Sequence, residues 1–354
     1  MNRIGTAVPP HDVHQTFIQF VSASLPDERS RKLFERMAKR AEIDHRFSHF
    51  RPGERLEQAA DSENFYMRGN FAGTGERMKR YEHDALDLAL RAVADLDIAE
   101  EKEEITHLVV ASCTGFTAPG LDQQLAAALG LNPDIERTLV GFMGCAAAVN
   151  ALKAAHHIVR SEPSAKVLVI NCELCTLHMQ DTSKLDQILA ALLFGDGCTA
   201  ALVSAEPTGL ALLDFKVATI PATQGLITWH IGDSGFSMHL SGEVPSHITS
   251  ALAHEAARND GGIFARTRPE EVELWAVHAG GRTILDAVEE GLRLDKEALR
   301  WSRNVLREFG NMSSATLMFV LNRMLRTVRG EAQGFGMAFG PGLVAETFRF
   351  RTVG

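Results

Sequence analysis

The chain has no excess of basic residues, since its formal net charge is −9 at pH 7 over 354 residues. Proteins that hold nucleic acid or an acidic membrane on an extended surface carry a surplus of Lys and Arg. The sequence therefore argues against a nucleic-acid partner and against an acidic-membrane surface. A local basic patch for a phosphorylated small molecule remains compatible with it.

Long apolar runs are also missing. A membrane-spanning helix needs about 18 or more consecutive apolar residues, and no stretch of the chain approaches that length. The opening MNRIGTAVPPHDVHQTF has neither the charged head nor the apolar run of a secretory signal. We therefore expect no membrane span and a cytoplasmic location.

Cysteine is scarce, and its pattern argues against a disulfide framework. The five cysteines are odd in number, scattered, and mostly placed within apolar runs: Cys113, Cys145, Cys172, Cys175 and Cys198. Such a pattern is typical of reduced cytosolic thiols. Cys172 and Cys175 form one C-x-x-C motif, but no second pair follows it, so we expect no bound metal.

The overall composition is that of a globular protein, with 45% hydrophobic and 23% charged residues. The length suggests two domains, or one large α/β unit with two halves. No linker rich in Pro, Gly or Ser separates the halves. We therefore expect one compact unit made of two related halves, residues 1–205 and 206–354.

Short apolar runs alternate with amphipathic stretches, which predicts strands alternating with helices. The expected strands are 106–112, 135–141, 166–171, 198–204, 209–219 and 272–279, with a closing strand, turn and strand over 336–350. The expected helices are 13–43, 81–97, 121–129, 146–160, 246–258, 283–292 and 315–328, and 50–80 is expected to be an excursion with short helices. This alternation predicts parallel-type sheets covered by helices on both faces.

The segment GFMGCAAAVNAL places Cys145 between a strand and the first turn of a helix. The N-terminal end of a helix presents unpaired N–H groups and a partial positive charge, and both stabilise a thiolate. Cys145 is therefore a candidate nucleophile. A buried structural cysteine fits this segment equally well when it is considered alone.

Two further residues also have both a catalytic and a structural interpretation. His278 stands at the end of the apolar run VELWAVHA, where a core histidine and a catalytic one are both common. Asn311 precedes a helix, where it serves either as an N-cap or as a neutral donor to an oxyanion. The combination of thiol, imidazole and amide favours acyl transfer from a thioester, with the last two stabilising an enolate.

At this point the sequence resembles a known family. Cys145, His278 and Asn311, with their spacing, are similar to the Cys–His–Asn triad of the chalcone-synthase-like, or type III, polyketide synthases of the thiolase superfamily. The segments LLFGDG, HAGG, GNMSS and AFGPGL agree with that resemblance. It implies a thiolase fold, in which two related βαβαβ-type halves form a layered α-β-α-β-α unit.

The resemblance also implies the reaction. Cys145 would carry the starter and the growing chain as a thioester, while His278 and Asn311 would stabilise the enolate that forms when malonyl-CoA loses carbon dioxide. Phe194 matches an aromatic that gates the coenzyme A tunnel and assists decarboxylation. Met238 stands where plant members have a second gating aromatic. The family implies a homodimer, malonyl-CoA and acyl-CoA as substrates, and no tightly bound cofactor.

Several residues are candidates for holding coenzyme A. Arg36 and Arg40 are spaced to share one face of a helix in RKLFERMAKR, and Lys32 is a possible third cation. Taken without the resemblance, this segment reads as a solvated charged face. The motifs GNMSS and AFGPGL add three further candidates: Ser313, Gly340 and Pro341.

Four positions are expected to shape the product. Cys113 and Cys175 stand where plant members have Thr. In having cysteine at both positions, the sequence resembles bacterial members that make tetrahydroxynaphthalene from malonyl units. Trp229 stands where plant members have Gly, so it should exclude bulky aromatic starters. Ala118 matches the family position whose side chain reaches from one subunit into the cavity of its partner.

The product class expected is an aromatic ring of resorcinol, phloroglucinol or naphthalene type, or a pyrone. A fatty-acyl-primed alkylresorcinol or alkylpyrone synthase is one alternative, and a ketoacyl synthase III-like condensing enzyme is another. A thioester-binding protein or a hydrolase that uses Cys145 only as an acyl acceptor is a third. Carbon dioxide release from malonyl-CoA would separate that third class from the condensing enzymes.

Overall fold

The computed structural model describes residues 1–25, 27–264 and 267–353, and it contains two main sheets. The first has five strands in the order β1 (Arg3–Ala7), β9 (Asp196–Val203), β8 (Val167–Leu174), β6 (His107–Ser112) and β7 (Glu136–Gly141). The second has four strands in the order β10 (Gly209–Thr219), β15 (Val344–Val353), β14 (Gln333–Gly340) and β13 (Leu274–Val277).

The sheets are mixed, so the prediction of parallel-type sheets was wrong for part of each. Strand β6 is parallel to β7 and β8, and β13 is parallel to β14. The remaining pairs are antiparallel. The reason is clearest at β14 and β15, because a short turn between consecutive strands can join only an antiparallel pair.

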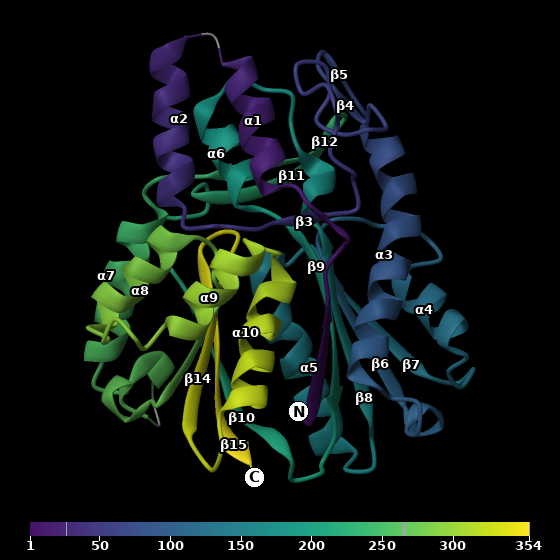
Figure 1. The fold of residues 1–354 in the computed structure, drawn as a ribbon. Helices are drawn as coiled ribbons and strands as arrows, with labels where there is room; N and C mark the ends of the chain where they lie inside the picture. The colour runs from purple at the N-terminus through teal and green to yellow at the C-terminus, as the bar shows by residue number, and fades with distance from the viewer. Residues whose placement is uncertain (26, 265–266, 354) are drawn as a thin grey trace.

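Helices separate and cover the two sheets (Figure 1). Helices α5 (Ala147–Ser161) and α10 (Ser314–Thr327) lie between the sheets, and their side chains share one core with both. Outside the first sheet lie α3 (Thr74–Leu96) and α4 (Leu121–Leu129). Outside the second lie α7 (Val244–Ala257), α8 (Arg282–Leu292) and α9 (Arg300–Phe309). The predicted α-β-α-β-α layering is confirmed.

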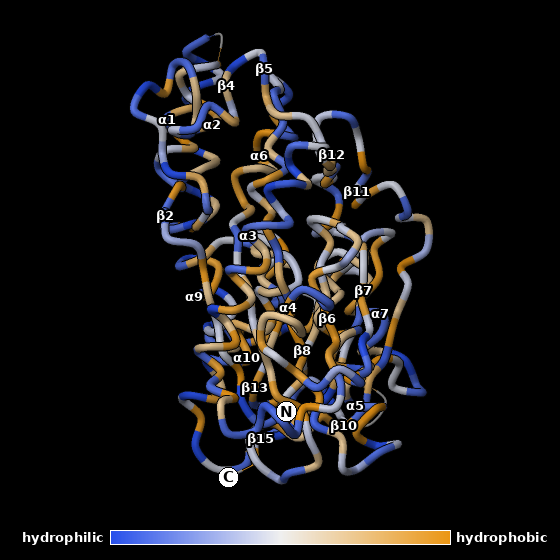
Figure 2. Tube along the Cα trace, turned by 90° about the vertical axis from the view of Figure 1, so that its right-hand side faces the viewer, coloured by the Kyte–Doolittle hydropathy of each residue, from blue (hydrophilic) through white to orange (hydrophobic). Residues whose placement is uncertain are grey.

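The middle layer depends on small side chains. Helix α5 buries a row of alanines and Leu152 completely: Ala147, Ala148, Ala151 and Ala155. Small residues let a helix approach neighbouring strands closely, which close-packed interiors require. Figure 2 shows that hydrophobic segments gather in the interior, while hydrophilic segments lie at the periphery of the molecule. No helix among the described residues is long and apolar enough to cross a bilayer.

A cap of smaller elements lies above one end of the two sheets (Figure 1). It contains the helices α1 (His14–Ser24), α2 (Glu28–Arg40) and α6 (Leu185–Leu193) and the hairpin of β11 (Ile227–Gly232) and β12 (Gly235–Leu240). Short pairs complete it: β2 (His11–Asp12) with β3 (Phe47–Ser48), and β4 (Tyr66–Met67) with β5 (Asn70–Phe71).

Two sequence predictions need correction here. The helix expected over 13–43 is two helices, because Leu25 is extended and the carboxylate of Asp27 accepts the Ser30 N–H at a new N-cap. The excursion over 50–80 contains a strand pair in place of short helices, and α3 already begins at Thr74. Asp61 explains this, since its carboxylate accepts backbone N–H groups and forms a turn.

Other elements were not predicted either: β1, β2, β3, α6, α9, β11 and β12. Short 3-10 turns also punctuate the chain at Lys102–Glu104, Gly144–Ala146, Cys175–His178, Gly262–Phe264 and Pro269–Glu271. The strand of residues Arg3–Ala7 carries few bulky apolar side chains, which hides it from pattern reading. It pairs with β9 and packs on α3.

The contact between β1 and α3 supplies a stability prediction. A Cβ added at Gly5 would lie 2.2 Å from the backbone N of Leu96 and 2.4 Å from the backbone O of Ala92. Because backbone atoms cannot swing aside, we expect Gly5→Ala to lower the free energy of unfolding by about 1–3 kcal/mol. Urea unfolding would measure it.

The matched control is Gly75→Ala, at an exposed site within α3 where an added Cβ meets nothing within 4 Å. Helix propensity predicts a gain of up to about 1 kcal/mol there. Equal urea midpoints for the parent protein and Gly5→Ala would contradict the close β1–α3 contact.

Candidate active site

Cys145 lies in the 3-10 turn Gly144–Ala146, between β7 and α5. Gly144 has a φ of 60°, a left-handed value that glycine adopts without strain. A Cβ at this position would lie 2.5 Å from Cδ of Pro341, in the turn between β14 and β15. The FGPG turn of the second half therefore packs directly against the residue before Cys145.

His278 follows β13 and is fixed through its backbone, whose N–H donates to the Met337 carbonyl at 2.8 Å. Its side chain is 2% exposed. Within the described part of the chain, neither ring nitrogen has a hydrogen-bond partner. No described protein group therefore occupies either imidazole nitrogen.

Asn311 connects three segments. Its amide Nδ2 donates to the Gly280 carbonyl at 3.1 Å, and its Oδ1 accepts the Ser313 N–H at 2.8 Å. Its backbone N–H donates to Leu193 O at 2.8 Å, and its carbonyl accepts the Gly195 N–H at 3.0 Å. Asn311 thus shapes the turn before α10 and also joins that turn to the loop after His278 and to the end of α6.

One cavity unites these residues, since Cys145, His278 and Asn311 all line it. Seven other predicted positions line the same cavity: Phe194, Met238, Ser313, Pro341, Cys113, Cys175 and Trp229. Gly340 lies just behind it, where an added Cβ would come within 3.0 Å of Ala146 Cβ.

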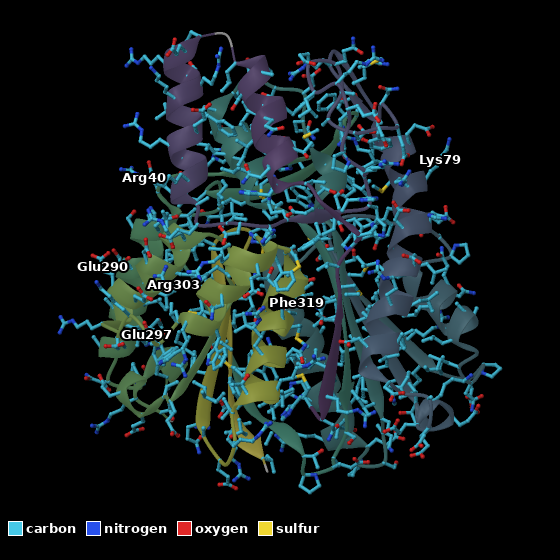
Figure 3. All side chains as sticks on the ribbon, viewed as in Figure 1. Arg40, Lys79, Glu290, Glu297, Arg303 and Phe319 are labelled. Atoms are coloured by element: carbon cyan, nitrogen blue, oxygen red, sulfur yellow. The ribbon has the colours of Figure 1, made fainter. Side chains whose placement is uncertain are left out.

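The remaining predicted positions lie elsewhere. Arg36, Arg40 and Lys32 are exposed on α2, and Lys32 forms an ion pair with Glu28 at 2.7 Å. Figure 3 shows Arg40 at the C-terminal end of that helix. Ala118 is exposed in the loop between β6 and α4 and precedes Pro119 through a cis peptide bond.

Burial controls the electrostatics of the site. Loss of hydration raises the pKa of the Cys145 thiol to about 12, although the side chains of Ser313 and Asn311 oppose the rise. Burial also lowers the pKa of His278 to about 3. The sequence predicted that the N-terminal end of α5 stabilises the Cys145 thiolate. Desolvation acts on the thiolate in the opposite direction and has the larger effect.

The same cause favours the neutral form of both groups, since an isolated charge is costly in an apolar environment. A proton moved from the thiol to an imidazole creates two opposite charges whose attraction is strong where water is excluded. An ion pair of Cys145 and His278 is thus the form in which this thiol would become nucleophilic.

Sequence reasoning missed the buried carboxyl group of Glu173 on β8. It accepts hydrogen bonds from the Cys113 N–H at 3.0 Å, the Thr114 hydroxyl at 2.9 Å and the Ser314 hydroxyl at 2.6 Å. Burial raises its pKa, and these donors oppose the rise. A charged residue at the end of the apolar run VLVINCEL was the available signal.

His178 and Phe236 were also missed as functional candidates, although both line the cavity. The ring nitrogens of His178 are both hydrogen-bonded, and its ring stacks on Phe236. Nothing in the short segment CTLHMQ indicates this, because the partners come from two distant segments of the chain.

The chain matches both domains of one known protein family. Residues 1–207 match the family described as chalcone and stilbene synthases, N-terminal domain, and residues 213–354 match the C-terminal domain. The chain belongs to the chalcone and stilbene synthase family. It is a type III polyketide synthase, an acyltransferase with a thiolase fold.

Relatives agree with this assignment. The alpha-pyrone synthesis polyketide synthase-like Pks18 of Mycobacterium tuberculosis is 35% identical over 285 residues, which cover 76% of this chain and 71% of the relative. PKS-I of the brown alga Ectocarpus siliculosus is 29% identical with a TM-score of 0.85, over 99% of this chain and 97% of that one.

A third relative is the 1,3,6,8-tetrahydroxynaphthalene synthase of Streptomyces coelicolor A3(2), which is described as a bacterial type III polyketide synthase. It is 27% identical, and the two structures superimpose with a TM-score of 0.85 over 100% of this chain and 99% of that one.

Both family matches are to chalcone and stilbene synthases, which favours a type III synthase over the ketoacyl synthase III alternative.

The desolvation of Cys145 and His278 leads to a prediction about thiol reactivity in this type III synthase. His278→Ala removes the imidazole but leaves the desolvation that raises the pKa of the thiol. We expect iodoacetamide to alkylate Cys145 at pH 7 at least about tenfold more slowly in the variant. Its rate should then rise with pH as more thiolate forms.

Peptide mass spectrometry after timed labelling would give the rates, with the exposed α7 residue His254 as a control in His254→Ala. Cys145 is partly exposed while the other four thiols are buried, so the labelled peptide identifies the site. Parental labelling of His278→Ala at pH 7 would show that the imidazole does not take the thiol's proton.

Proposed function

We propose that this synthase joins malonyl-CoA units to an acyl group carried on Cys145 and releases a cyclised pyrone. The observation that carries the proposal is the convergence of Cys145, His278 and Asn311 on one cavity.

Acylation would begin with the Cys145 thiolate. It attacks the carbonyl carbon of an acyl-CoA, and the carbon–sulfur bond to coenzyme A breaks as the bond to Cys145 forms. The coenzyme A thiolate leaves with the proton that His278 took from Cys145. The acyl group is then held as a thioester at the start of α5.

Decarboxylation would follow when malonyl-CoA occupies the cavity. The bond between the malonyl methylene and its carboxylate breaks, and the electron pair moves towards the thioester oxygen as an enolate. His278 has unpartnered ring nitrogens, and one N–H of the Asn311 amide remains beyond its bond to Gly280. Two such donors stabilise a developing oxyanion in a site that excludes water.

Condensation would use that carbanion. The methylene carbon attacks the acyl thioester, a carbon–carbon bond forms, and the bond to Cys145 breaks. The lengthened chain is now on coenzyme A and returns to Cys145 for another round. Attack of a chain oxygen on the thioester carbon closes a pyrone and frees the thiol.

Phe194 would help to expel the carboxylate. It follows α6, its carbonyl accepts the Arg46 guanidinium at 2.7 Å, and it forms a parallel bridge with Asn311. Its apolar side chain lines the same cavity as His278 and Asn311, which supports a position beside the proposed enolate. An apolar wall raises the energy of a carboxylate more than that of carbon dioxide. Together with Phe194, Met238 on β12 would form the gate of the coenzyme A tunnel.

An aliphatic acyl group is the starter that the cavity supports best. The lining extends from Cys145 and Cys175 to apolar side chains of α1 and α6, including Phe17, Ala190 and Ala191. Trp229 occupies another part of the wall, which disfavours a bulky aromatic starter. The pyrone outcome draws on the similarity to the alpha-pyrone synthesis relative.

A second candidate is an aromatic product made from malonyl units alone. The presence of Cys113 and Cys175 in the cavity favours it, together with the similarity to the tetrahydroxynaphthalene synthase. Both candidates share the proposed chemistry at Cys145 and differ only in starter and ring closure.

Assembly as a homodimer is also part of the proposal. Strand β7 is at an edge of the first sheet, and three large apolar side chains near it are exposed by 37%, 46% and 42%: Phe116, Leu139 and Met143. An unpaired apolar edge favours association with a second strand. The five free thiols suit a reducing compartment, so we propose the cytoplasm.

The product assay tests the function directly. Radiolabelled malonyl-CoA is incubated with the protein alone and then with medium- and long-chain acyl-CoAs, beside Cys145→Ala. We expect a pyrone that contains the acyl starter and disappears in Cys145→Ala, because no thioester can form. Liquid chromatography with mass spectrometry would identify the product.

The alternatives give distinct results in that assay. An aromatic product from malonyl-CoA alone would move the assignment to the second candidate. Absence of any Cys145-dependent product with every starter would remove the polyketide proposal itself.

The basic helix α2 gives a prediction about substrate binding. We propose that Arg36 and Arg40 hold the phosphates of coenzyme A, since charge-assisted hydrogen bonds contribute about 1.5–3 kcal/mol. Arg36→Ala and Arg40→Ala should each raise KM for malonyl-CoA about tenfold and leave kcat nearly unchanged.

Arg31→Ala is the matched control, since Arg31 is exposed on a different face of α2. Steady-state kinetics at two salt concentrations would measure KM and kcat for the two test variants and the control. Unchanged KM values in both test variants would remove α2 from the substrate site.

A further inference from the structure

Arg46 is a cation buried between α1 and the end of α6, and the steps proposed above do not use its charge. The residue is 2% exposed, yet it lines the cavity that contains Cys145. Burial lowers the pKa of its guanidinium to about 10, and the charges of Asp12 and Asp196 oppose that change. The group therefore stays charged at neutral pH. A buried charge is costly, so its surroundings must offset that cost.

The guanidinium joins two helices of the cap, α1 and α6, which pack on each other (Figure 1). Its Nε donates to His14 Nδ1 at 2.9 Å, at the start of α1. Its Nη1 donates to the carbonyls of Ala191 at 2.9 Å and Phe194 at 2.7 Å, at the end of α6. Because the guanidinium is planar and its donors point in fixed directions, the bond to His14 also sets the direction of Nη1.

His14 holds this guanidinium in its orientation. An arginine nitrogen only donates, so Nδ1 of His14 is the acceptor and carries no proton. His14 is 1% exposed, and burial lowers its pKa to about 4, which keeps the accepting form at neutral pH. The Asp12 carboxylate accepts the backbone N–H groups of His14 at 3.1 Å and of Arg46 at 3.3 Å. The two residues are therefore held together through their backbones as well as through their side chains.

The aliphatic part of the Arg46 side chain packs on the bridge between Phe194 and Asn311. This parallel bridge includes the bond from the Gly195 N–H to the Asn311 carbonyl at 3.0 Å. A glycine is the chain neighbour of each residue in the bridge. A Cβ added at Gly195 would lie 3.4 Å from Arg46 Cβ, and one added at Gly310 would lie 2.8 Å from Arg46 Cγ. Arg46 thus fills the space that the two glycines leave open beside the bridge.

We propose that Arg46, oriented by His14, is a positioning residue for the decarboxylation of malonyl-CoA. Its Nη1 holds the Phe194 carbonyl, and its aliphatic part supports the bridge to Asn311. Two of the groups proposed to act on the malonyl unit therefore keep one relative position. The inference rests on the proposed function, since it concerns one step of that reaction. Arg46 itself takes no part in bond making, and its effect passes through Phe194 and Asn311.

Acylation of Cys145 provides an internal comparison. The turn that carries Cys145 packs on Pro341, and the backbone N–H of His278 donates to the Met337 carbonyl. The side-chain hydrogen bonds of Arg46 go to neither of these segments. Loss of the guanidinium should therefore weaken decarboxylation more than acylation, whereas a general loss of structure should weaken both.

The test uses Arg46→Lys, which keeps the charge but has a single nitrogen and cannot reach His14 and both carbonyls at once. We expect kcat for carbon dioxide release from radiolabelled malonyl-CoA to fall at least about tenfold. Acylation of Cys145 by an acyl-CoA alone, followed by mass spectrometry of the intact protein, should slow by less than about threefold. The matched control is Arg51→Lys, at an exposed arginine in the loop after β3, where both rates should stay parental.

Two variants of His14 test the orienting contact. His14→Asn places an amide oxygen near the Nδ1 position and keeps an acceptor, whereas His14→Leu has none. We expect His14→Leu to slow carbon dioxide release at least about threefold, and His14→Asn to stay closer to the parental rate. In Arg46→Ala, guanidinium added below the concentrations that unfold the protein should restore part of the release, because the ion can occupy the space of the missing side chain.

If Arg46→Lys does not fold, His14→Leu carries the test, because it leaves the bonds from Arg46 to α6 in place. A loss that falls mainly on decarboxylation in either folded variant supports the proposal. Parental carbon dioxide release in the folded variants would overturn it. An equal loss of acylation and decarboxylation would also overturn it, since that result indicates a merely structural role. Absence of carbon dioxide release in the parent protein would instead refute the proposed function.

Discussion

The hydrogen bonds of Asn311 determine how the site is assembled. Through its side chain and backbone, this residue joins the end of α6, the loop after His278 and the turn that begins α10. These segments come from both halves of the chain, and each carries a group that the proposed reaction uses. Because Asn311 itself is buried, loss of these bonds would leave unpaired polar groups in an apolar interior. The relative positions of Phe194 and of the loop after His278 therefore depend on one residue.

Desolvation gives this arrangement its chemical character. The cavity keeps Cys145 and His278 neutral when each is considered separately, and it makes their opposite charges attract strongly when a proton passes between them. The same exclusion of water strengthens donors aimed at an enolate and weakens the hold on a carboxylate. Acylation, decarboxylation and condensation thus use one physical property of the site.

Much of this was readable from the sequence, and the limits have physical causes. Motifs such as GFMGC and GNMSS identify residues whose local backbone is special, and the structure brings Cys145, His278 and Asn311 to one cavity. The alternation of apolar and amphipathic segments predicted most elements within a few residues. The α-β-α-β-α layering came from the family resemblance, and the structure confirmed it. The direction of pairing in the sheets was not predictable from periodicity, because a buried strand has the same pattern in either orientation.

Tertiary contacts were the second limit. Glu173 and His178 act through partners from distant segments, so their neighbours in sequence say little about them. The effect of burial on Cys145 was also hidden, because a helix N-terminus is visible in a sequence while the depth of a cavity is not.

The separation of the β11–β12 hairpin from the main sheets has a consequence for the evolution of the family. The residues proposed to make bonds sit on segments anchored to both sheets, whereas part of the cavity wall sits on a hairpin that is a strand of neither. Substitutions at the cavity-lining positions of the hairpin can therefore change the cavity without altering a strand of either main sheet. Such an arrangement lets a lineage change its repertoire of natural products while the reaction itself is inherited intact.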